Sequence, residues 1–184
     1  MMRIIGGSAR GRRLFAPKSR AIRPTADRVR ESLFNVLGQS FDGIEVLDLF
    51  AGSGALALEA LSRGARHAVM VDKDREAIRL CEANAAALGF GERVRTIAAP
   101  VAAAVKSLGR EGASFELIFA DPPYAAGAVA EALVQIDAAR LCRPGGIVCI
   151  EHDKRELSPP SAGALAQIDQ RRFGDTVVSI YRFA

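Results

Sequence analysis

The fold of this chain is decided by the stretch IEVLDLFAGSG, residues 44–54. Residues 44–49 are apolar enough to form a buried strand, and residues 55–63 are rich in alanine and leucine, which favours a helix. The glycines between them give the backbone the freedom that a tight turn from strand to helix needs. The stretch therefore predicts the first strand–helix unit of an α/β fold.

The same alternation of strands and helices continues towards the C-terminus, where a hairpin turns at Gly174-Asp175. This pattern predicts a mixed sheet, mostly parallel with right-handed crossovers, that ends in an antiparallel hairpin. The predicted strands are 44–49, 68–71, 93–98, 115–120, 146–151 (after a turn at Pro144-Gly145-Gly146), 166–173 and 176–182, and the predicted helices are 26–38, 55–63, 75–88, 101–109 and 127–139.

The glycine turn also places reactive groups at the carboxyl end of the sheet, where α/β proteins bind ligands. Gly52 and Gly54 let backbone N–H groups approach a ligand, and Asp72, after the next strand, can accept hydrogen bonds from both ribose hydroxyls. Asp48 precedes the glycines, where a carboxylate would repel a pyrophosphate but would suit the ammonium of an amino acid. This favours S-adenosylmethionine over NAD, although the glycine spacing alone also fits a dinucleotide site or a plain tight turn.

A second candidate site is the run Asp121-Pro122-Pro123-Tyr124, which follows the predicted strand 115–120. Proline fixes φ and restricts the residue before it, so this run is stiff and cannot relax into a helix. A fixed carboxylate beside an aromatic face suits a flat ring that bears an amine. The alternative is a strand that ends in a proline turn with a surface tyrosine, and the tetrapeptide alone leaves both open.

Composition limits the range of functions. At 184 residues the chain fits one domain with a full core, and it has no apolar run of 18 residues that would span a membrane. The N-terminus lacks the apolar stretch of a secretory signal. Cys81, Cys142 and Cys149 match no metal-binding spacing and are expected to be buried free thiols of a cytoplasmic protein. His67 and His152 stand far apart, so no metal site is predicted.

Positive charge is concentrated at the N-terminus. Residues 1–40 carry a net charge of +7, while the whole chain carries +4. A basic block of this kind indicates a nucleic-acid partner, and a solvated tail is the alternative. Residues 2–15 predict a glycine-rich hairpin, and the segment from 26 predicts an amphipathic helix with its arginines exposed. The candidate RNA-binding residues are Arg10, Arg12, Arg13, Arg23, Arg28 and Arg30.

Two sets of motifs resemble a known family. Residues 48–54 together with 121–124 are similar to class I S-adenosylmethionine-dependent methyltransferases, with a Rossmann-like fold, that modify exocyclic base amines through an (Asp/Asn)-Pro-Pro-(Tyr/Phe) motif. Residues 3–7 (RIIGG), 10–14 (RGRRL) and 23–31 (RPTADRVRE) narrow the resemblance to the RsmD family. The members of that family are bacterial 16S rRNA (guanine(966)-N(2))-methyltransferases.

The resemblance implies a site and a partner. Asp121, Pro122 and Tyr124 are the expected catalytic residues, and the partner is 16S rRNA in an assembling or assembled small subunit, with no obligate protein partner. It divides the chain into a basic hairpin extension, 1–24, and a methyltransferase domain, 25–184. The expected cofactor-binding residues are Asp48, Phe50, Gly52, Gly54, Asp72, Val101 and Asp121.

One departure from the family concerns the adenine of the cofactor. Many relatives carry an acid just after the third strand, whereas residues 98–101 (AAPV) offer no carboxylate. Backbone groups, Val101 with its neighbours, or water must therefore hold the adenine.

The expected reaction moves a methyl group from sulfonium to guanine N2. The Asp121 carboxylate and the Pro122 carbonyl would accept hydrogen bonds from the amine and aim its lone pair, while Tyr124 stacks on the base. A DNA adenine-N6 methyltransferase shares this tetrapeptide and is the nearest rival. A non-catalytic RNA-binding protein on the same fold is a second rival, and an NAD oxidoreductase is a third.

Overall fold

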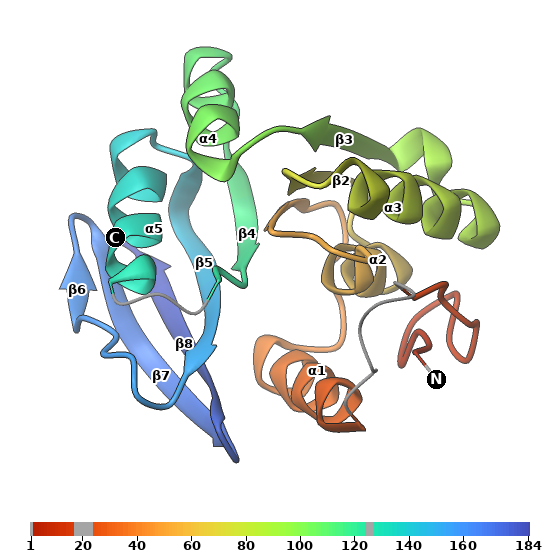
Figure 1. Ribbon diagram of the computed structural model, residues 1–184, viewed down its shortest axis with the longest axis horizontal. Coiled ribbons are helices and arrows are strands. Elements are labelled where there is room, and N and C mark those ends of the chain that lie inside the picture. Colours follow the sequence, from red (N-terminus) through yellow and green to blue (C-terminus); the bar gives the residue numbers. More distant parts are fainter. Residues whose placement is uncertain (1, 17–23, 124–126) are drawn as a thin grey trace.

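The computed structural model describes residues 2–16, 24–123 and 127–184, which form one mixed eight-stranded sheet with helices on both faces (Figure 1). The strand order is β3-β2-β1-β4-β5-β8-β7-β6. The strands are β1 Glu45–Leu49, β2 His67–Asp72, β3 Val94–Ala98, β4 Phe115–Ala120, β5 Cys142–Asp153, β6 Ser161–Ala162, β7 Leu165–Phe173 and β8 Thr176–Phe183. The helices are α1 Pro24–Leu37, α2 Ala55–Ser62, α3 Arg75–Leu88, α4 Val101–Arg110 and α5 Ala128–Ala138, with a 3-10 turn η1 at Gly91–Arg93.

Strands β1 and β4 are neighbours in the middle of the sheet, and the order in which strands are added reverses there. Strands β2 and β3 lie on the far side of β1, and β5 lies on the far side of β4. All five strands are parallel. Strand β8 then pairs antiparallel with β5, and β7 with β8. The predicted mixed sheet and its closing hairpin are therefore confirmed, and the point of reversal is where sheets of this kind bind ligands.

Alternating residues of the central strands face two separate hydrophobic layers. Val46 and Leu117 pack with α1, α2 and α3 on one face of the sheet. Their neighbours Leu47 and Ile118 pack with α4 and α5 on the other face. Because successive side chains of a strand point to opposite faces, Asp48 falls on the same face as α2. This parity brings its carboxylate under the start of that helix.

One predicted turn is wrong. Residues Pro144-Gly145-Gly146 lie within β5, which begins at Cys142 rather than at 146. The register with β4 pairs Phe115 with Cys142 and then Leu117 with Ile147, so the extra residues bulge out of the ladder. Proline and glycine suit a bulge as well as a turn, which is why the sequence pattern does not separate the two.

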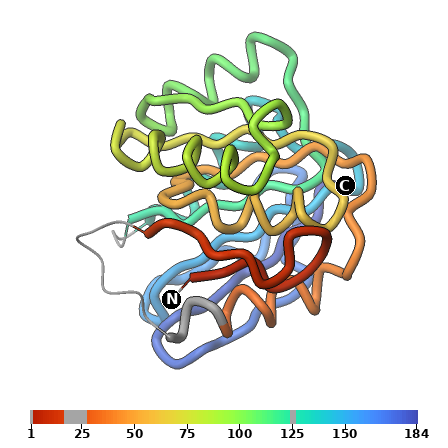
Figure 2. Tube along the Cα trace, turned by 90° about the vertical axis from the view of Figure 1, so that its right-hand side faces the viewer, coloured from red at the N-terminus to blue at the C-terminus, as the bar shows by residue number. Residues whose placement is uncertain are grey.

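The N-terminal segment doubles back as predicted, but it forms one isolated antiparallel bridge, Arg3–Arg13, in place of two regular strands. We call residues 2–15 the N-terminal ribbon. Figure 2 shows it in red against helices α1 and α2. Ile4 and Leu14 are buried in the layer that contains α1 and α2, so the ribbon is packed against the domain and is not a solvated tail.

A buried carboxylate fastens the ribbon to α2. Glu59 is fully buried and accepts hydrogen bonds from the backbone N–H groups of Ile5 at 2.8 Å and Gly6 at 2.7 Å. The Nε of Arg63 donates to the same carboxylate at 2.9 Å. Ser62 adds a hydrogen bond from its Oγ to the carbonyl of Gly6 at 2.6 Å. The helix that follows the glycine turn thus carries the ribbon directly.

The burial of Arg30 differs from what the sequence predicts. The sequence pattern predicts that it is exposed on α1, yet its side chain is 5% exposed and donates to the carbonyl of Arg3. Its Nε lies 3.9 Å from the Glu59 carboxylate. The partner acid lies on another helix far along the chain, so the helical pattern around Arg30 could not reveal this burial.

The cysteines and one histidine lie in the core. All three cysteines are buried and free, as predicted. His152 is buried and its Nε2 lies 2.9 Å from the Ser179 hydroxyl, so it serves the core. Among the described residues, no group of His, Cys, Asp and Glu could hold a metal ion. None of the helices in this part of the chain is long and apolar enough to cross a membrane.

Candidate active site

Three carboxylates meet where the strand order reverses. Asp48 lies in β1, Asp72 ends β2, and Asp121 follows β4 directly. Leu49 of β1 is in register with Val71 on one side and Ala120 on the other, so Asp72 and Asp121 flank the end of β1. The structure therefore brings together the three acids that the sequence pattern places at successive strand ends.

Asp48 is the most perturbed of these acids. Its side chain is 3% exposed and accepts a hydrogen bond from the Ala57 N–H, in the first turn of α2, at 3.3 Å. The pKa of this carboxyl is raised from 3.8 to about 7, mainly by burial and in smaller part by the carboxylates of Asp121 and Asp72, against the lowering effect of that hydrogen bond. A buried acid that repels two neighbouring acids is stabilised by a cationic ligand.

The loop between β1 and α2 has a left-handed backbone at three positions. Phe50, Gly52 and Gly54 have φ values of 67°, 56° and 75°. A bulky residue such as Phe50 rarely adopts this conformation, at a cost of about 1–3 kcal/mol, and such strain is concentrated at functional sites. The surrounding structure thus holds Phe50 in a backbone conformation that a bulky residue disfavours.

The two glycines serve different purposes. A Cβ on Gly54 would lie 2.9 Å from the Met70 sulfur and 3.3 Å from that of Cys81, so Gly54 allows α2 to pack closely on the neighbouring elements. A Cβ on Gly52 would meet open space, with no atom nearer than the Phe50 carbonyl oxygen at 4.0 Å. The space beside the Cα of Gly52 is therefore open to a ligand. The N–H groups of Gly52 and Gly54 already donate within the protein, to Asp72 and to the Ala51 carbonyl.

Asp72 holds the glycine loop in place. One carboxylate oxygen accepts from the Gly52 N–H at 3.0 Å and the other from the Asp74 N–H at 2.9 Å. An ionised carboxylate offers about four lone-pair sites, so two hydrogen bonds leave capacity for the hydroxyls of a ribose. Asp72 is half-buried at the end of β2, where that capacity faces the crevice end of the sheet.

The proline corner after β4 lies beside this loop. Asp121 is half-buried, Pro122 is buried and Pro123 is exposed. Tyr124, the aromatic residue of the motif, lies outside the described residues, so its predicted stacking role stays a prediction. The corner places the Asp121 carboxylate close enough to Asp48 to influence its pKa.

Val101 begins α4 and is half-buried, directly after the stretch that lacks an acid. The Ala99 N–H donates to the Asp72 carbonyl at 3.0 Å, which holds this stretch against the end of β2. The backbone here is positioned next to Asp72 without a carboxylate of its own.

Two contacts of this region were missed by sequence reasoning. The Glu156 carboxylate, in the loop after β5, accepts from the Val129 N–H at 2.9 Å and so caps the start of α5, the helix that follows the proline corner. Asn84 of α3 contacts the glycine loop through the Ser53 carbonyl at 2.9 Å. The two pairs are 27 and 31 residues apart in the sequence, and no local pattern marks them.

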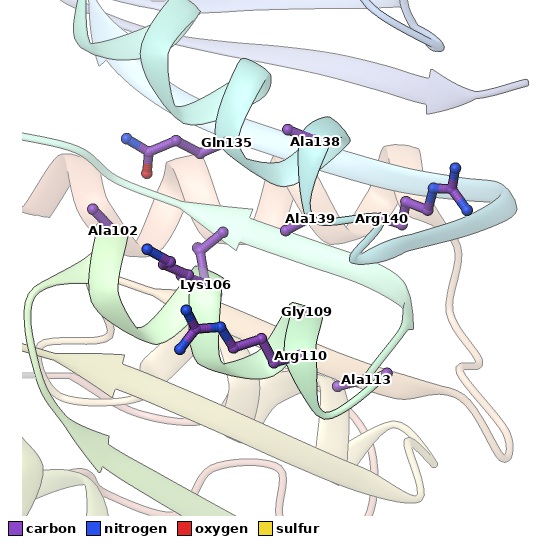
Figure 3. A pocket seen from close by; sticks show the side chains of 11 residues that line it. Ala102, Lys106, Gly109, Arg110, Ala113, Gln135, Ala138, Ala139 and Arg140 are labelled. Atoms are coloured by element: carbon purple, nitrogen blue, oxygen red, sulfur yellow. The ribbon is translucent and has the colours of Figure 1, made fainter.

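A groove of about 690 Å³ lies elsewhere, between α4 and α5 (Figure 3). Its rim carries the cationic side chains of Lys106, Arg110 and Arg140. Among the predicted site residues that the structure describes, none lines it, so this hollow is separate from the three carboxylates.

Fold and site together define a class. The sheet has the parallel order 3-2-1-4-5 and is extended by an antiparallel strand. A glycine loop follows β1, an acid ends β2, and an Asp-Pro-Pro corner follows β4. These are the features of a class I methyltransferase. Enzymes of this class use S-adenosylmethionine as methyl donor. The chain belongs to the family described as "Conserved hypothetical protein 95", whose model matches residues 2–182. The resemblance to the RsmD family is thereby confirmed.

Two curated relatives carry rRNA methyltransferase names. The chain is 38% identical over 181 residues to "Putative rRNA methyltransferase YlbH" of Bacillus subtilis, and the alignment covers 98% of each chain. It is 42% identical over 132 residues to "Ribosomal RNA small subunit methyltransferase D" of Escherichia coli, and this alignment covers 72% of this chain and 65% of the relative.

Solved structures agree with the fold. The Escherichia coli protein described as "Putative methyltransferase yhhF" superposes with a TM-score of 0.86 at 32% identity, over 99% of this chain and 97% of that one. The Thermus thermophilus 16S rRNA N2 G1207 methyltransferase, solved with S-adenosylmethionine and guanosine, gives a TM-score of 0.71 at 25% identity, over 91% of this chain and 45% of that one.

The pKa of Asp48 predicts how donor binding depends on pH. If Asp48 binds the donor's ammonium group as the sequence predicts, only its ionised carboxylate would do so, and the ionised population in the free protein rises as the pH rises through about 7. We expect the Kd for S-adenosylmethionine to be about fivefold larger at pH 6 than at pH 7, which means weaker binding at the lower pH. Isothermal titration calorimetry over this range measures it.

The variant Asp48→Asn keeps the size of the side chain but cannot ionise. It should bind the donor more weakly at pH 7 and show no pH dependence between pH 6 and pH 7. A flat profile in the wild-type protein would contradict the role given to Asp48.

Proposed function

We propose that this protein methylates the N2 amine of a guanine in the 16S rRNA of the bacterial small ribosomal subunit, with S-adenosylmethionine as donor. The observation that carries the proposal is the Asp121-Pro122 corner beside the buried Asp48 and the open glycine loop. The rRNA methyltransferase names of the curated relatives support the choice of RNA. The three buried free thiols fit a cytoplasmic protein.

The residues present fit the proposed donor. Asp48 is a buried acid that a cation stabilises, and the donor carries an ammonium group. The open backbone at Gly52 leaves room for the donor, and Asp72 retains acceptor sites for a ribose. Val101, at the start of α4, and the backbone of the preceding residues would contact the adenine, and Phe50 belongs to the strained glycine loop.

Catalysis by this site is mainly positioning. When bound, S-adenosylmethionine supplies a methyl group on an excellent leaving group, so the protein has to orient a poor nucleophile. The Asp121 carboxylate and the Pro122 carbonyl accept hydrogen bonds from the guanine amine. These bonds would draw its lone pair out of the ring and free it to attack the methyl group, and the proton released from N2 would pass to the Asp121 carboxylate or to water. Tyr124 would stack on the base once it has left its helix or loop.

The N-terminal ribbon would hold the RNA backbone. Arg10, Arg12, Arg13 and Arg28 are all exposed, and the ribbon is fixed to α2 by the buried Glu59. Arg23 belongs to the same proposed surface and lies outside the described residues, whereas Arg30 is buried and supports the ribbon from below. Residues 1–24 would thus contribute RNA binding and residues 25–184 the chemistry. Arginine suits phosphate through its planar fork.

Removing the Asp121 carboxylate tests the catalytic assignment. Asp121→Ala should lower methyl transfer by at least about 100-fold, because the amine loses its acceptor, while the Kd for S-adenosylmethionine stays within a few-fold of wild type. Single-turnover transfer and calorimetric titration measure the two quantities.

Asp121→Asn is the matched control, since it retains an acceptor oxygen at the same place. It should keep more activity than Asp121→Ala. If Asp121→Ala loses donor binding as strongly as it loses transfer, Asp121 serves only the cofactor and its catalytic assignment is wrong.

Charge reversal tests the ribbon. The triple variant Arg10→Glu, Arg12→Glu, Arg13→Glu should weaken RNA binding and reduce the slope of log K against log salt by about one for each phosphate that is no longer neutralised. Filter binding of a 16S rRNA transcript at several salt concentrations measures this slope.

The groove between α4 and α5 offers a control with the same change in charge. Reversal of Lys106, Arg110 and Arg140 should leave the slope within error of wild type, because these side chains lie on a different surface. Equal decreases of slope in the two triple variants would show that the ribbon is no specific RNA surface.

A further inference from the structure

Asn84 lies where the glycine loop and the N-terminal ribbon meet. Its side chain, on α3, is fully buried. The Nδ2 group donates to the Ser53 carbonyl at 2.9 Å and to the Phe15 carbonyl at 3.1 Å. The Oδ1 atom accepts from the Phe15 N–H at 2.7 Å. One amide therefore joins the backbone of the proposed RNA-binding segment to the backbone of the proposed cofactor loop.

Both N–H groups of the amide are in use at once. The amide is planar, so Phe15 cannot shift relative to α3 without turning the group that also holds Ser53. Ser53 lies between Gly52 and Gly54, whose left-handed backbone shapes the loop. A displacement of Phe15 at the end of the ribbon is thus transmitted to the loop through the Asn84 side chain.

Two further contacts strengthen this junction. The Cys81 thiol, one turn earlier on α3, donates to the Gly52 carbonyl at 3.3 Å. The Ser53 hydroxyl lies 3.3 Å from the sulfur of Met2, at the other end of the ribbon. The loop is therefore held between α3 on one side and the ribbon on the other.

We propose that Asn84 is a positioning residue that couples RNA binding to donor binding, so that each ligand raises the affinity for the other. The proposal rests on the function proposed above, since it needs RNA on the ribbon and the donor on the glycine loop. RNA that fixes the ribbon fixes Phe15, and through Asn84 it fixes Ser53 in the conformation that the donor requires. By thermodynamic reciprocity the donor strengthens RNA binding by the same factor.

Ser62 provides a matched control. It is buried, and its hydroxyl also fastens the ribbon, accepting from the Ala9 N–H at 2.9 Å and donating to the Gly6 carbonyl at 2.6 Å. Both of these hydrogen bonds go to the ribbon rather than to the glycine loop. Ser62→Ala therefore loosens the ribbon without touching the link to Ser53.

The measurement is the ratio of two dissociation constants for S-adenosylhomocysteine, without and with a saturating unmodified 16S rRNA transcript. Wild type should give a ratio of at least about five. Asn84→Asp keeps the acceptor for the Phe15 N–H but loses the donors, so its ratio should fall close to one. Ser62→Ala should bind RNA more weakly and keep the wild-type ratio. Circular dichroism checks folding, and Asn84→Ala replaces Asn84→Asp if the latter does not fold.

A merely structural role for Asn84 would change stability without changing this ratio. The proposal is overturned if wild type gives a ratio of one, if the Asn84 variant keeps the wild-type ratio, or if Ser62→Ala loses it equally. Methylation of the transcript by wild type is assayed in parallel. Methylation with a ratio of one defeats the coupling alone, whereas a wild-type protein that neither binds nor methylates the transcript defeats the proposed function as well.

Discussion

The left-handed turn between β1 and α2 constrains most of what surrounds it. Its backbone conformation at Gly52 and Gly54 directs the chain from the middle of the sheet into a helix that packs against the neighbouring strand. That helix begins above Asp48 and carries Glu59 one turn further on, where it binds the ribbon. A change in this turn would therefore disturb the proposed cofactor loop and the proposed RNA-binding surface together.

The charges around the same turn determine which kind of ligand it suits. Asp48, Asp72 and Asp121 converge at the end of β1, and burial raises the pKa of Asp48 to about 7. A site of this kind costs stability when it is empty and is relieved by a cationic ligand. The donor's ammonium and sulfonium groups fit that requirement, whereas the pyrophosphate of a dinucleotide would add to the repulsion.

Periodicity and turn chemistry are enough to predict much of the fold. The bounds of α3 and β4 agree with the prediction, because Asp74 and Gly89 punctuate the helix and an unbroken apolar run forms the strand. The carboxylates at the strand ends also follow from the alternation of strands and helices. The bulge in β5 does not, since Pro144 and Gly145 carry the same signal for a turn.

Contacts between distant parts of the chain could not be predicted. Arg30 has the pattern of an exposed helical arginine, and only the folded chain brings Glu59 of α2 beneath it. Asn84 has the pattern of an ordinary polar residue in a helix, although it is fully buried and joins two loops. Glu156 caps a helix through Val129, 27 residues before it. Such roles depend on the assembled fold, and those of Arg30 and Asn84 lie where the ribbon meets the rest of the domain.

Transfer of a methyl group to guanine N2 in 16S rRNA can be measured with labelled S-adenosylmethionine and three substrates: unmodified small subunits, naked 16S rRNA and DNA. Nucleoside analysis identifies the products. A guanine-N2 methyltransferase gives N2-methylguanosine in RNA and leaves DNA unlabelled. N6-methyladenine as the product would contradict the proposed function.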